Sequence, residues 1–341
     1  MTQPTSVNMT FDTSLVDLNP NASFSTTESD PSDIGTLNLP SKTPKIQQPS
    51  LFEEQSQDTP KQSQTLSSSN SMPPPKVPTP VQHIPTQDAY DQWASIYDSD
   101  GNMLQSIDDL ELTTLLPDFL GKVSSNVQNQ EISVLDLGCG TGRNTAKLLS
   151  YSWPQNSRIS VTGLDFSKGM LDVAAQKLRP FVEGSVNEQS RTELRLECSD
   201  CFPTVSNPAA SPLPAVPNLT PVNGVISTLV LEHIPLRSYF STLSSLLQPN
   251  GIALVTNMHA DMGRVSQAGF INAEGVKVRG SSFAFTVEET VAEARKAGFE
   301  IVSVKERSMT KEDVESGLVG ERGWKWVGIN VWYGMVLRKV V

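Results

Sequence analysis

The sequence predicts an α/β fold with a doubly wound, mostly parallel sheet of seven strands. One observation is an apolar run, residues 132–137, that leads directly into a turn with glycine at every second position. Such runs bounded by glycine are typical of parallel strands buried on both faces. The second observation is the alternation of strand-like and helix-like segments along the chain after this turn, which is typical of βαβ units.

Residues 1–85 have a composition that cannot build a core. They hold 13 of the 24 prolines and none of the five tryptophans or five tyrosines, and they are rich in Ser, Thr, Gln and Asn. Too little apolar surface is present there to offset the entropy lost on folding. We therefore predict a disordered Ser/Thr/Pro-rich tail over 1–85 and one domain over 86–341.

Two helices are expected before the first strand. Thr86 is a candidate N-cap of the first, and Tyr90, Trp93 and Tyr97 follow as one aromatic stripe at helical spacing. The second is expected over 108–120. Core packing is the simpler interpretation of the stripe, although the Tyr97 hydroxyl could also reach a cleft.

The remaining elements follow from apolar runs, glycines and prolines. A proline-rich stretch without charged residues, 202–221, predicts an irregular insertion, and 258–285 predicts a glycine-containing, hairpin-like excursion. The last strand alternates apolar and polar residues as an antiparallel strand does. The expected strands are 132–137, 158–165, 192–198, 222–229, 252–257, 302–306 and 329–338, and the expected helices are 144–150, 167–178, 235–247 and 287–297.

The turn after the first strand carries Gly138, Gly140 and Gly142. Glycine permits positive φ angles and lets the backbone approach a ligand closely, and the free N–H groups of the following helix face the same cleft. A dinucleotide loop needs the spacing G-x-G-x-x-G, but Arg143 stands at its last glycine position. The register therefore argues against NAD.

Two carboxylates flank this turn. Asp136 precedes it, and Asp165 ends the next strand, where a βαβ unit presents an acid to ribose hydroxyls. The turn contains no Lys or Arg before Arg143. These charges favour a cationic nucleotide-type ligand over a pyrophosphate.

Five segments in this order resemble the motifs of class I S-adenosylmethionine-dependent methyltransferases, and the resemblance covers roughly residues 86–341. One departure is Asn223, which stands where the family usually opens its fourth strand with aspartate. The segments are Asp136-Leu-Gly-Cys-Gly-Thr-Gly142, Gly163-Leu-Asp165-Phe-Ser-Lys-Gly-Met170-Leu, Glu197-Cys-Ser-Asp200-Cys201, Asn223-Gly-Val-Ile-Ser-Thr228-Leu-Val-Leu-Glu232-His233-Ile and Leu247-Gln-Pro-Asn-Gly251.

The resemblance implies that S-adenosyl-L-methionine is the cofactor and assigns residues to its adenosine half. Asp165 would accept hydrogen bonds from the ribose hydroxyls. Phe166 and Met170 would flank the adenine. Asp200 would bind the adenine amino group, with the Cys201 backbone nearby.

The same resemblance assigns the methionine half of the cofactor and a cover for the cleft. Thr228 would line the cleft under the sulfonium, and the Tyr97 hydroxyl would reach it. Helices over 86–125 would form part of a lid. The methionine side would be shaped by the loop residues Asp136, Gly138, Cys139, Gly140, Thr141 and Gly142.

Two of the three histidines follow strand ends, where ligands bind in open α/β sheets. His233 follows the fourth strand and His259 the fifth. Imidazole titrates near neutral pH and can remove a proton from a methyl acceptor, so both are candidate catalytic bases. Asp261 could orient His259, whereas the alternative for His233 is a purely structural role at the start of a helix.

No metal site is predicted. Residues 98–102 imitate the start of a calcium loop, but Met103 stands where that loop needs glycine. Cys198 and Cys201 form a C-x-x-C pair without a partner pair, and their place at a strand end explains them without zinc or redox chemistry.

The chain carries a formal net charge of −11 without a basic block. Nucleic acid is therefore not an expected partner, because phosphate binding needs clustered Lys and Arg. No apolar run reaches the length of a membrane span, and no signal or transit peptide is recognisable. Three cysteines, an odd number, fit a reducing compartment. A cytoplasmic protein is expected, with the nucleus left open.

The predicted function is methyl transfer to a small-molecule acceptor at N, O, S or C. Residues 89–98 and the excursion after the fifth strand resemble those of quinone-type and natural-product methyltransferases, which implies a role in secondary metabolism. One alternative is a regulatory or scaffolding protein that binds protein partners through residues 1–85. Others are a protein methyltransferase and, more distantly, an NAD-dependent reductase.

Overall fold

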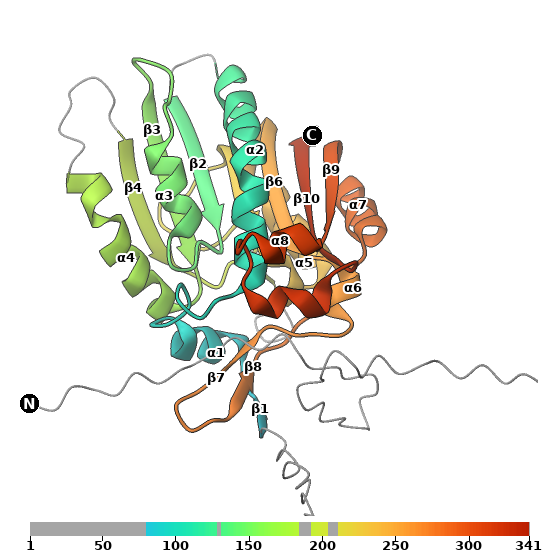
Figure 1. The fold of residues 1–341 in the computed structure, drawn as a ribbon. Coiled ribbons are helices and arrows are strands. Elements are labelled where there is room, and N and C mark those ends of the chain that lie inside the picture. The colour runs from blue at the N-terminus through green and yellow to red at the C-terminus, as the bar shows by residue number, and fades with distance from the viewer. Residues whose placement is uncertain (1–79, 128–130, 184–191, 204–210, 341) are drawn as a thin grey trace, which may run out of the picture. The chain divides into compact units, whose positions relative to one another are not determined.

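A seven-stranded sheet forms the centre of the structure, a computed structural model that describes residues 80–127, 131–183, 192–203 and 211–340. Its strand order is β4-β3-β2-β5-β6-β10-β9 (Figure 1). All pairs from β4 to β6 are parallel, and β10 is antiparallel to both of its neighbours. The predicted α/β class and antiparallel last strand are thus confirmed. The strands are β2 (Glu131–Leu137), β3 (Arg158–Asp165), β4 (Thr192–Cys198), β5 (Val222–Thr228), β6 (Leu247–Met258), β9 (Phe299–Ser308) and β10 (Asn330–Lys339).

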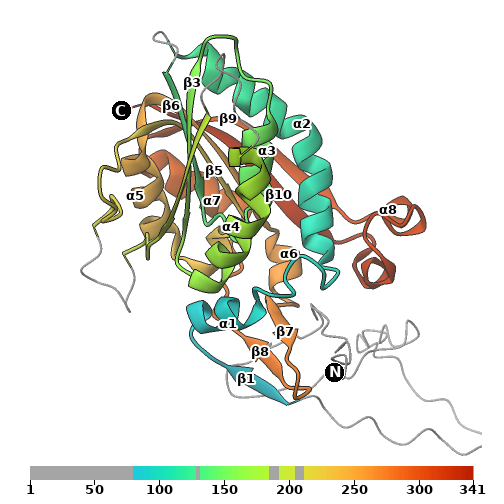
Figure 2. The ribbon, with the colours of Figure 1, turned by 90° about the vertical axis from the view of Figure 1, so that its left-hand side faces the viewer.

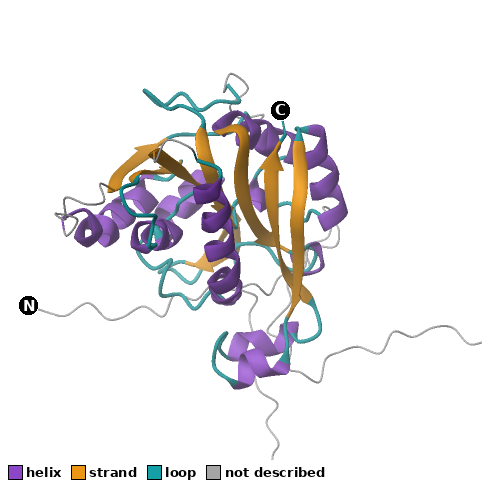
Figure 3. Cartoon of the chain, turned by 90° about the horizontal axis from the view of Figure 1, so that it is seen from above, coloured by secondary structure: helices purple, strands orange, loops and turns teal. Residues whose placement is uncertain are grey.

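Helices cover both faces of this sheet (Figure 3). One face packs against α2 and α3, with α4 beside α3, and the other packs against α5 and α7. The helices are α1 (Thr86–Trp93), α2 (Met103–Ser125), α3 (Arg143–Ser150), α4 (Lys168–Glu183), α5 (Leu236–Leu246), α6 (Ala260–Gly263), α7 (Val287–Lys296) and α8 (Lys311–Glu315), with 3₁₀ turns η1 (Leu231–His233) and η2 (Glu321–Trp326).

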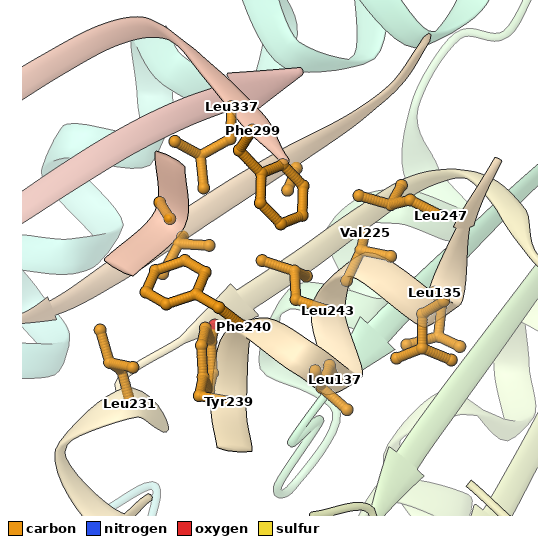
Figure 4. Close-up of a cluster of buried hydrophobic side chains, with 14 of the residues drawn as sticks. Leu135, Leu137, Val225, Leu231, Tyr239, Phe240, Leu243, Leu247, Phe299 and Leu337 are labelled. Atoms are coloured by element: carbon orange, nitrogen blue, oxygen red, sulfur yellow. The ribbon is translucent and has the colours of Figure 1, made fainter. Parts of the chain in front are cut away.

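Successive residues of the central strands enter different cores. In β2, Leu135 belongs to the cluster under α5 and α7, whereas Val134 belongs to the cluster under α2 and α3. This follows from the two-residue period of a strand. Figure 4 shows the first cluster, where Tyr239, Phe240 and Leu243 of α5 pack on the sheet. The apolar runs in the sequence therefore reflect burial on both faces.

The strand order reverses at β2, which pairs with β3 on one side and β5 on the other. Ligands of open α/β sheets bind at such a switch point, beyond the carboxyl ends of the strands. In Figure 2, α1 lies beyond this end of the sheet, together with a small second sheet. That sheet has the order β1 (Val81–His83), β8 (Lys277–Arg279), β7 (Gly269–Ile271).

The boundary of the predicted tail needs correction. Residues 1–79 lie outside the described residues, but Val81–His83 form β1, parallel to Lys277–Arg279. No local pattern indicates this strand, because its partner strand lies almost 200 residues away in the chain. Thr86 is not the cap of α1 either: Pro85 holds that position, and the Thr86 hydroxyl accepts a hydrogen bond from the Ser281 amide at 3.1 Å.

Other elements agree with the prediction in kind but differ in length. α2 begins at Met103 rather than 108, because the Asn102 side chain caps it by accepting from the Leu104 amide. The excursion 258–285 contains the hairpin β7–β8, as expected. Residues 204–210 of the insertion lie outside the described residues, and 211–221 form neither helix nor strand. The short α8 and η2 were not predicted.

Candidate functional site

The glycine turn between β2 and α3 closes onto the end of β3. The amides of Gly138 and Cys139 both donate to the Leu164 carbonyl, at 2.8 and 3.0 Å. Gly138 has φ +75°, and a Cβ there would lie 2.3 Å from a methyl of Val230. Gly140 also has positive φ, yet a Cβ there would meet nothing within 4 Å. The backbone at Gly140 therefore borders open space that a ligand can fill.

Asp165 connects this turn to the end of β3. Its two carboxylate oxygens accept from the amides of Gly140 and Ser167, both at 2.8 Å. Burial raises the pKa of this carboxyl to about 6. Each oxygen retains a further lone pair, so the group can accept hydrogen bonds from a bound ligand while it holds the loop.

Asp136 lies beneath the turn rather than in its opening. Its carboxylate accepts from the Thr145 hydroxyl at 2.7 Å, and burial raises its pKa to about 6. The residue anchors the first turn of α3 to β2. It shapes the loop through this contact and is almost fully buried.

The other side of the turn is held by polar side chains. Thr141 donates from its hydroxyl to Asp98 at 2.6 Å. Gly142 is the N-cap of α3 with φ +79°, a conformation that suits glycine. The Thr228 hydroxyl, at the end of β5, accepts from the side-chain amide of Asn144 at 2.7 Å. These contacts join the loop, α3 and the switch-point strands.

The residues predicted to contact adenine separate into two groups. Phe166 and the exposed Asp200 follow β3 and β4, at the carboxyl end of the sheet. Met170, in contrast, is 1% exposed and packs among the side chains of α1. It therefore supports α1, and its assignment as an adenine contact stays a prediction. Cys201 is buried, and its carbonyl accepts from Thr242.

Cys139 is a small side chain packed under the loop. A Cβ added at Gly163 would lie 3.0 Å from its Sγ, so strand and loop touch at this point. Burial raises the pKa of this thiol well above its usual value. A protonated, buried thiol is inert as a nucleophile, which agrees with its prediction as a loop residue.

A pocket lies between α1, the start of α2 and the segments at the ends of β5 and β6. Aromatic and apolar side chains form most of its wall, and one carboxylate, Glu232, lines it. Its lining residues are Tyr90, Trp93, Tyr97, Asn102, Leu104, Leu229, Glu232, Met258, Met262, Ser266, Gln267 and Ala268. This position beyond the strand ends suits a substrate.

α1 is fastened over this region by side-chain hydrogen bonds. Gln87 donates to the Phe166 carbonyl at 2.7 Å, and Asp91 accepts from the Ser167 hydroxyl and the Gly169 amide at 2.6 and 2.9 Å. The helix thus bridges the cofactor side of the site and the pocket. The resemblance implied a lid over 86–125, and that role stays a prediction.

His233 supports the cover from the opposite side. Its Nδ1 lies 2.7 Å from the Ser281 carbonyl, which can only accept, so Nδ1 carries the proton. Nε2 then accepts from the Tyr90 hydroxyl at 2.8 Å. Burial lowers the pKa of this imidazole, so the ring is neutral. The lone pair of Nε2 is therefore already occupied by the Tyr90 hydroxyl.

The family of the chain follows from two sequence comparisons. Residues 105–304 match the model of a methyltransferase domain family. An uncharacterized methyltransferase of Emericella nidulans is 42% identical over 272 residues, which cover 75% of this chain and 91% of that protein. The chain is a class I S-adenosylmethionine-dependent methyltransferase.

More distant matches were also found. A malonyl-[acyl-carrier protein] O-methyltransferase of Priestia megaterium is 39% identical over 59 residues, 17% of this chain and 20% of that protein. Among solved structures, a methyltransferase of Mesorhizobium loti is 18% identical with a TM-score of 0.41, covering 63% of this chain and 95% of that one. Geranyl diphosphate C-methyltransferase of Streptomyces coelicolor is 12% identical with a TM-score of 0.43, covering 67% and 76%.

The residues of this methyltransferase fit its cofactor. The open space at Gly140 leaves room for the cofactor, and the Asp165 carboxylate can accept hydrogen bonds from ribose hydroxyls. The carboxylates at 136 and 165 also match a cationic ligand. Asn223 does not disturb this fit, because it lies at the amino end of β5, where its side-chain oxygen accepts from the Ser133 amide at 2.8 Å.

His259 of the methyltransferase is held by protein groups, and its role as a base stays a prediction. Its Nδ1 accepts from the Asp261 amide at 3.0 Å, which makes it the N-cap of α6. Its Nε2 contacts Glu306 at 2.9 Å. Both ring nitrogens are occupied by protein groups, and the residue does not line the pocket described above.

Residues 98–102, which imitate the start of a calcium loop, hold α1 in place in the methyltransferase. Asp100 accepts from the Trp93 indole at 2.7 Å and from the Asn102 amide at 3.0 Å, and Trp93 stacks on Phe270 with ring centroids 5.4 Å apart. Within the described residues, no group of three His, Cys, Asp or Glu side chains could hold a metal ion. No helix there is long and apolar enough to cross a membrane.

Glu232 is the residue that sequence reasoning missed. It lies in a motif segment, but an acid before a helix is usually a solvated end group. In the structure it is 4% exposed, and burial raises the pKa of its carboxyl to about 8. The signal in the sequence that could have found it is an acid just after a strand at the predicted switch point.

Proposed function

We propose that this methyltransferase acts on a small molecule that binds in the pocket between α1 and the ends of β5 and β6. The observation that carries the proposal is the aromatic and apolar lining of a pocket covered by a hydrogen-bonded helix. Apolar and aromatic walls of this kind are typical of small-molecule sites. An extended protein substrate would need an open groove.

Different residues of the chain serve the cofactor and the acceptor during methyl transfer. S-adenosylmethionine, when bound, supplies an activated methyl group. Gly140 and Asp165 hold the cofactor side, and Thr228 stands at the junction of the two sides. Tyr90, fixed by His233, orients the lid over the acceptor. Enclosing the two reactants holds them close together and excludes water. Proximity and a dry site are the main requirements of the methyl displacement.

The biological setting belongs to the same proposal. The resemblance of residues 89–98 to those of natural-product methyltransferases supports a role in secondary metabolism. Protein partners bound through residues 1–85 would be an addition to this activity, not a substitute for it.

The test uses methyl-labelled S-adenosylmethionine and an extract of the organism that encodes the protein. After incubation, the small-molecule and protein fractions are separated and counted. We expect label in the small-molecule fraction with the wild-type protein and background label with Asp165→Ala. Label that enters protein instead would overturn the proposal.

A further inference from the structure

Glu232 places a buried carboxylate among the aromatic side chains of the pocket. One of its oxygens lies 3.4 Å from the Met258 amide, a long and weak hydrogen bond. The Asn257 side chain bonds the Glu232 backbone amide, not the carboxylate. The carboxylate therefore receives little compensation from the protein for its loss of water.

No positive charge in the described lining of the pocket balances this group, because that lining contains no Lys or Arg. The nearest basic group is His233, with Nε2 3.7 Å from the carboxylate, and its ring is neutral. The titratable groups that face Glu232 are Asp108, His233, Tyr90, Tyr97 and Tyr333. None of them supplies a cation at neutral pH.

A buried carboxyl without a cationic partner holds a proton, unless a ligand cation stabilises its ionised form. A ligand ammonium would do so through charge-assisted hydrogen bonds. The rings of Tyr90 and Tyr97 line the same pocket, and aromatic faces attract cations. A neutral hydroxyl or carbon acceptor brings no positive charge to the carboxylate or to the aromatic faces.

We propose that the methyl acceptor is an amine, bound as its ammonium ion by the Glu232 carboxylate and the rings of Tyr90 and Tyr97. The inference rests on the proposed function, since it names the substrate class of the same pocket. It also assigns Glu232 as the residue that takes the proton from the acceptor.

The reaction balances as follows. The Glu232 carboxylate accepts one proton from the ammonium and leaves a neutral amine. The amine nitrogen forms a bond to the methyl carbon while the bond from that carbon to sulfur breaks, and the sulfur keeps the electron pair. The product is an N-methylammonium ion and a neutral thioether. Glu232 then releases its proton to water.

The other possible source of positive charge is the sulfonium of the cofactor. A carboxylate that served the sulfonium would favour S-adenosylmethionine over the neutral S-adenosylhomocysteine. Calorimetry of Glu232→Gln with both compounds separates the two cases. We expect both affinities to stay within about threefold of wild type, while a selective loss for S-adenosylmethionine would overturn the proposal.

The identity of the labelled product tests the substrate class directly. From the labelled small-molecule fraction described above, mass spectrometry and NMR locate the methyl group. An N-methylated amine supports the proposal. An O-, S- or C-methylated product overturns it and leaves small-molecule methylation standing, whereas the absence of any labelled small molecule speaks against the proposed function itself.

With that amine in hand, Glu232→Gln is compared with Glu274→Gln, which changes an exposed residue in the β7–β8 turn. Loss of one partner of a buried charge pair should lower kcat/KM for the amine about 30-fold or more. Glu274→Gln should match wild type. Equal kcat/KM in all three proteins would refute the role of Glu232.

Discussion

At the scale of single residues, Glu232 makes the free protein sensitive to pH. Burial raises the pKa of its carboxyl from the ordinary value of 4.5 to about 8. The native state therefore keeps this proton where the unfolded chain has lost it. Stability from this group is fully present below pH 4.5 and declines as pH rises from there to about 8, because the unfolded chain ionises freely while the native state keeps the proton.

We expect the free energy of unfolding of the wild type to fall relative to Glu232→Gln between pH 6.5 and 8. Each pH unit in this window corresponds to about 1.4 kcal/mol at most. Urea unfolding of both proteins at several pH values measures the difference, and contributions from other groups cancel in the comparison. Parallel pH profiles would show that Glu232 is ionised in the free protein.

His259 allows a separate test at the residue scale. Because its Nδ1 caps α6, His259→Asn should preserve the cap, since asparagine is a good N-cap residue. The contact with Glu306 and the ring contact with Tyr333 are lost, so stability should fall by about 1 kcal/mol and kcat should stay near that of wild type. A loss of kcat of more than about a hundredfold would restore His259 as a base.

At the scale of elements, Asp108 of α2 joins four parts of the fold. Its buried carboxylate accepts from Arg143 at 2.6 Å, from the Thr256 hydroxyl at 2.6 Å and from the Trp332 indole at 2.9 Å. These partners belong to α3, β6 and β10. Arg143 follows the glycine turn directly, so this network ties the turn to α2.

Asp109 provides a matched control, since it also pairs with Arg143, at 2.6 Å, but its side chain is 45% exposed. Asp108→Asn leaves a buried guanidinium without its main partner and should cost about 3 kcal/mol or more. Asp109→Asn should cost less than about 1 kcal/mol. Chemical denaturation of the two variants checks the ranking, and equal losses would contradict the importance of burial here.

At the scale of the whole molecule, the described secondary structure begins before residue 86, where the domain was predicted to start. β1 pairs with β8, and the Ile84 amide donates to Arg279 at 3.0 Å. A chain that starts at residue 85 loses these backbone hydrogen bonds, each worth about 1 kcal/mol, whereas one that starts at residue 80 keeps them.

We expect the shorter chain to have a Tm lower by about 5 °C. Differential scanning calorimetry of the two truncated proteins measures this difference. Identical melting temperatures would mean that β1 contributes nothing to the fold.

Local sequence patterns predicted most of the fold and the cofactor loop. Apolar runs marked the strands because the sheet is buried on both faces, and glycine spacing marked the turn because positive φ is needed there. The acceptor side was harder to predict. The contact of Tyr90 with His233 joins residues 143 positions apart, and that of His259 with Glu306 spans 47. Such pairings depend on the tertiary structure, as does the burial of Glu232 and Met170.

The most direct test of the account is calorimetric binding of S-adenosylhomocysteine to the wild type, Asp165→Ala and Asp172→Ala. Asp172 is an exposed α4 residue paired with Lys168. The account predicts one site in the wild type, unchanged affinity in Asp172→Ala, and at least about tenfold weaker binding in Asp165→Ala, from lost charge-assisted hydrogen bonds. Unchanged affinity in a folded Asp165→Ala protein, or binding of NADH in place of S-adenosylhomocysteine, would contradict it.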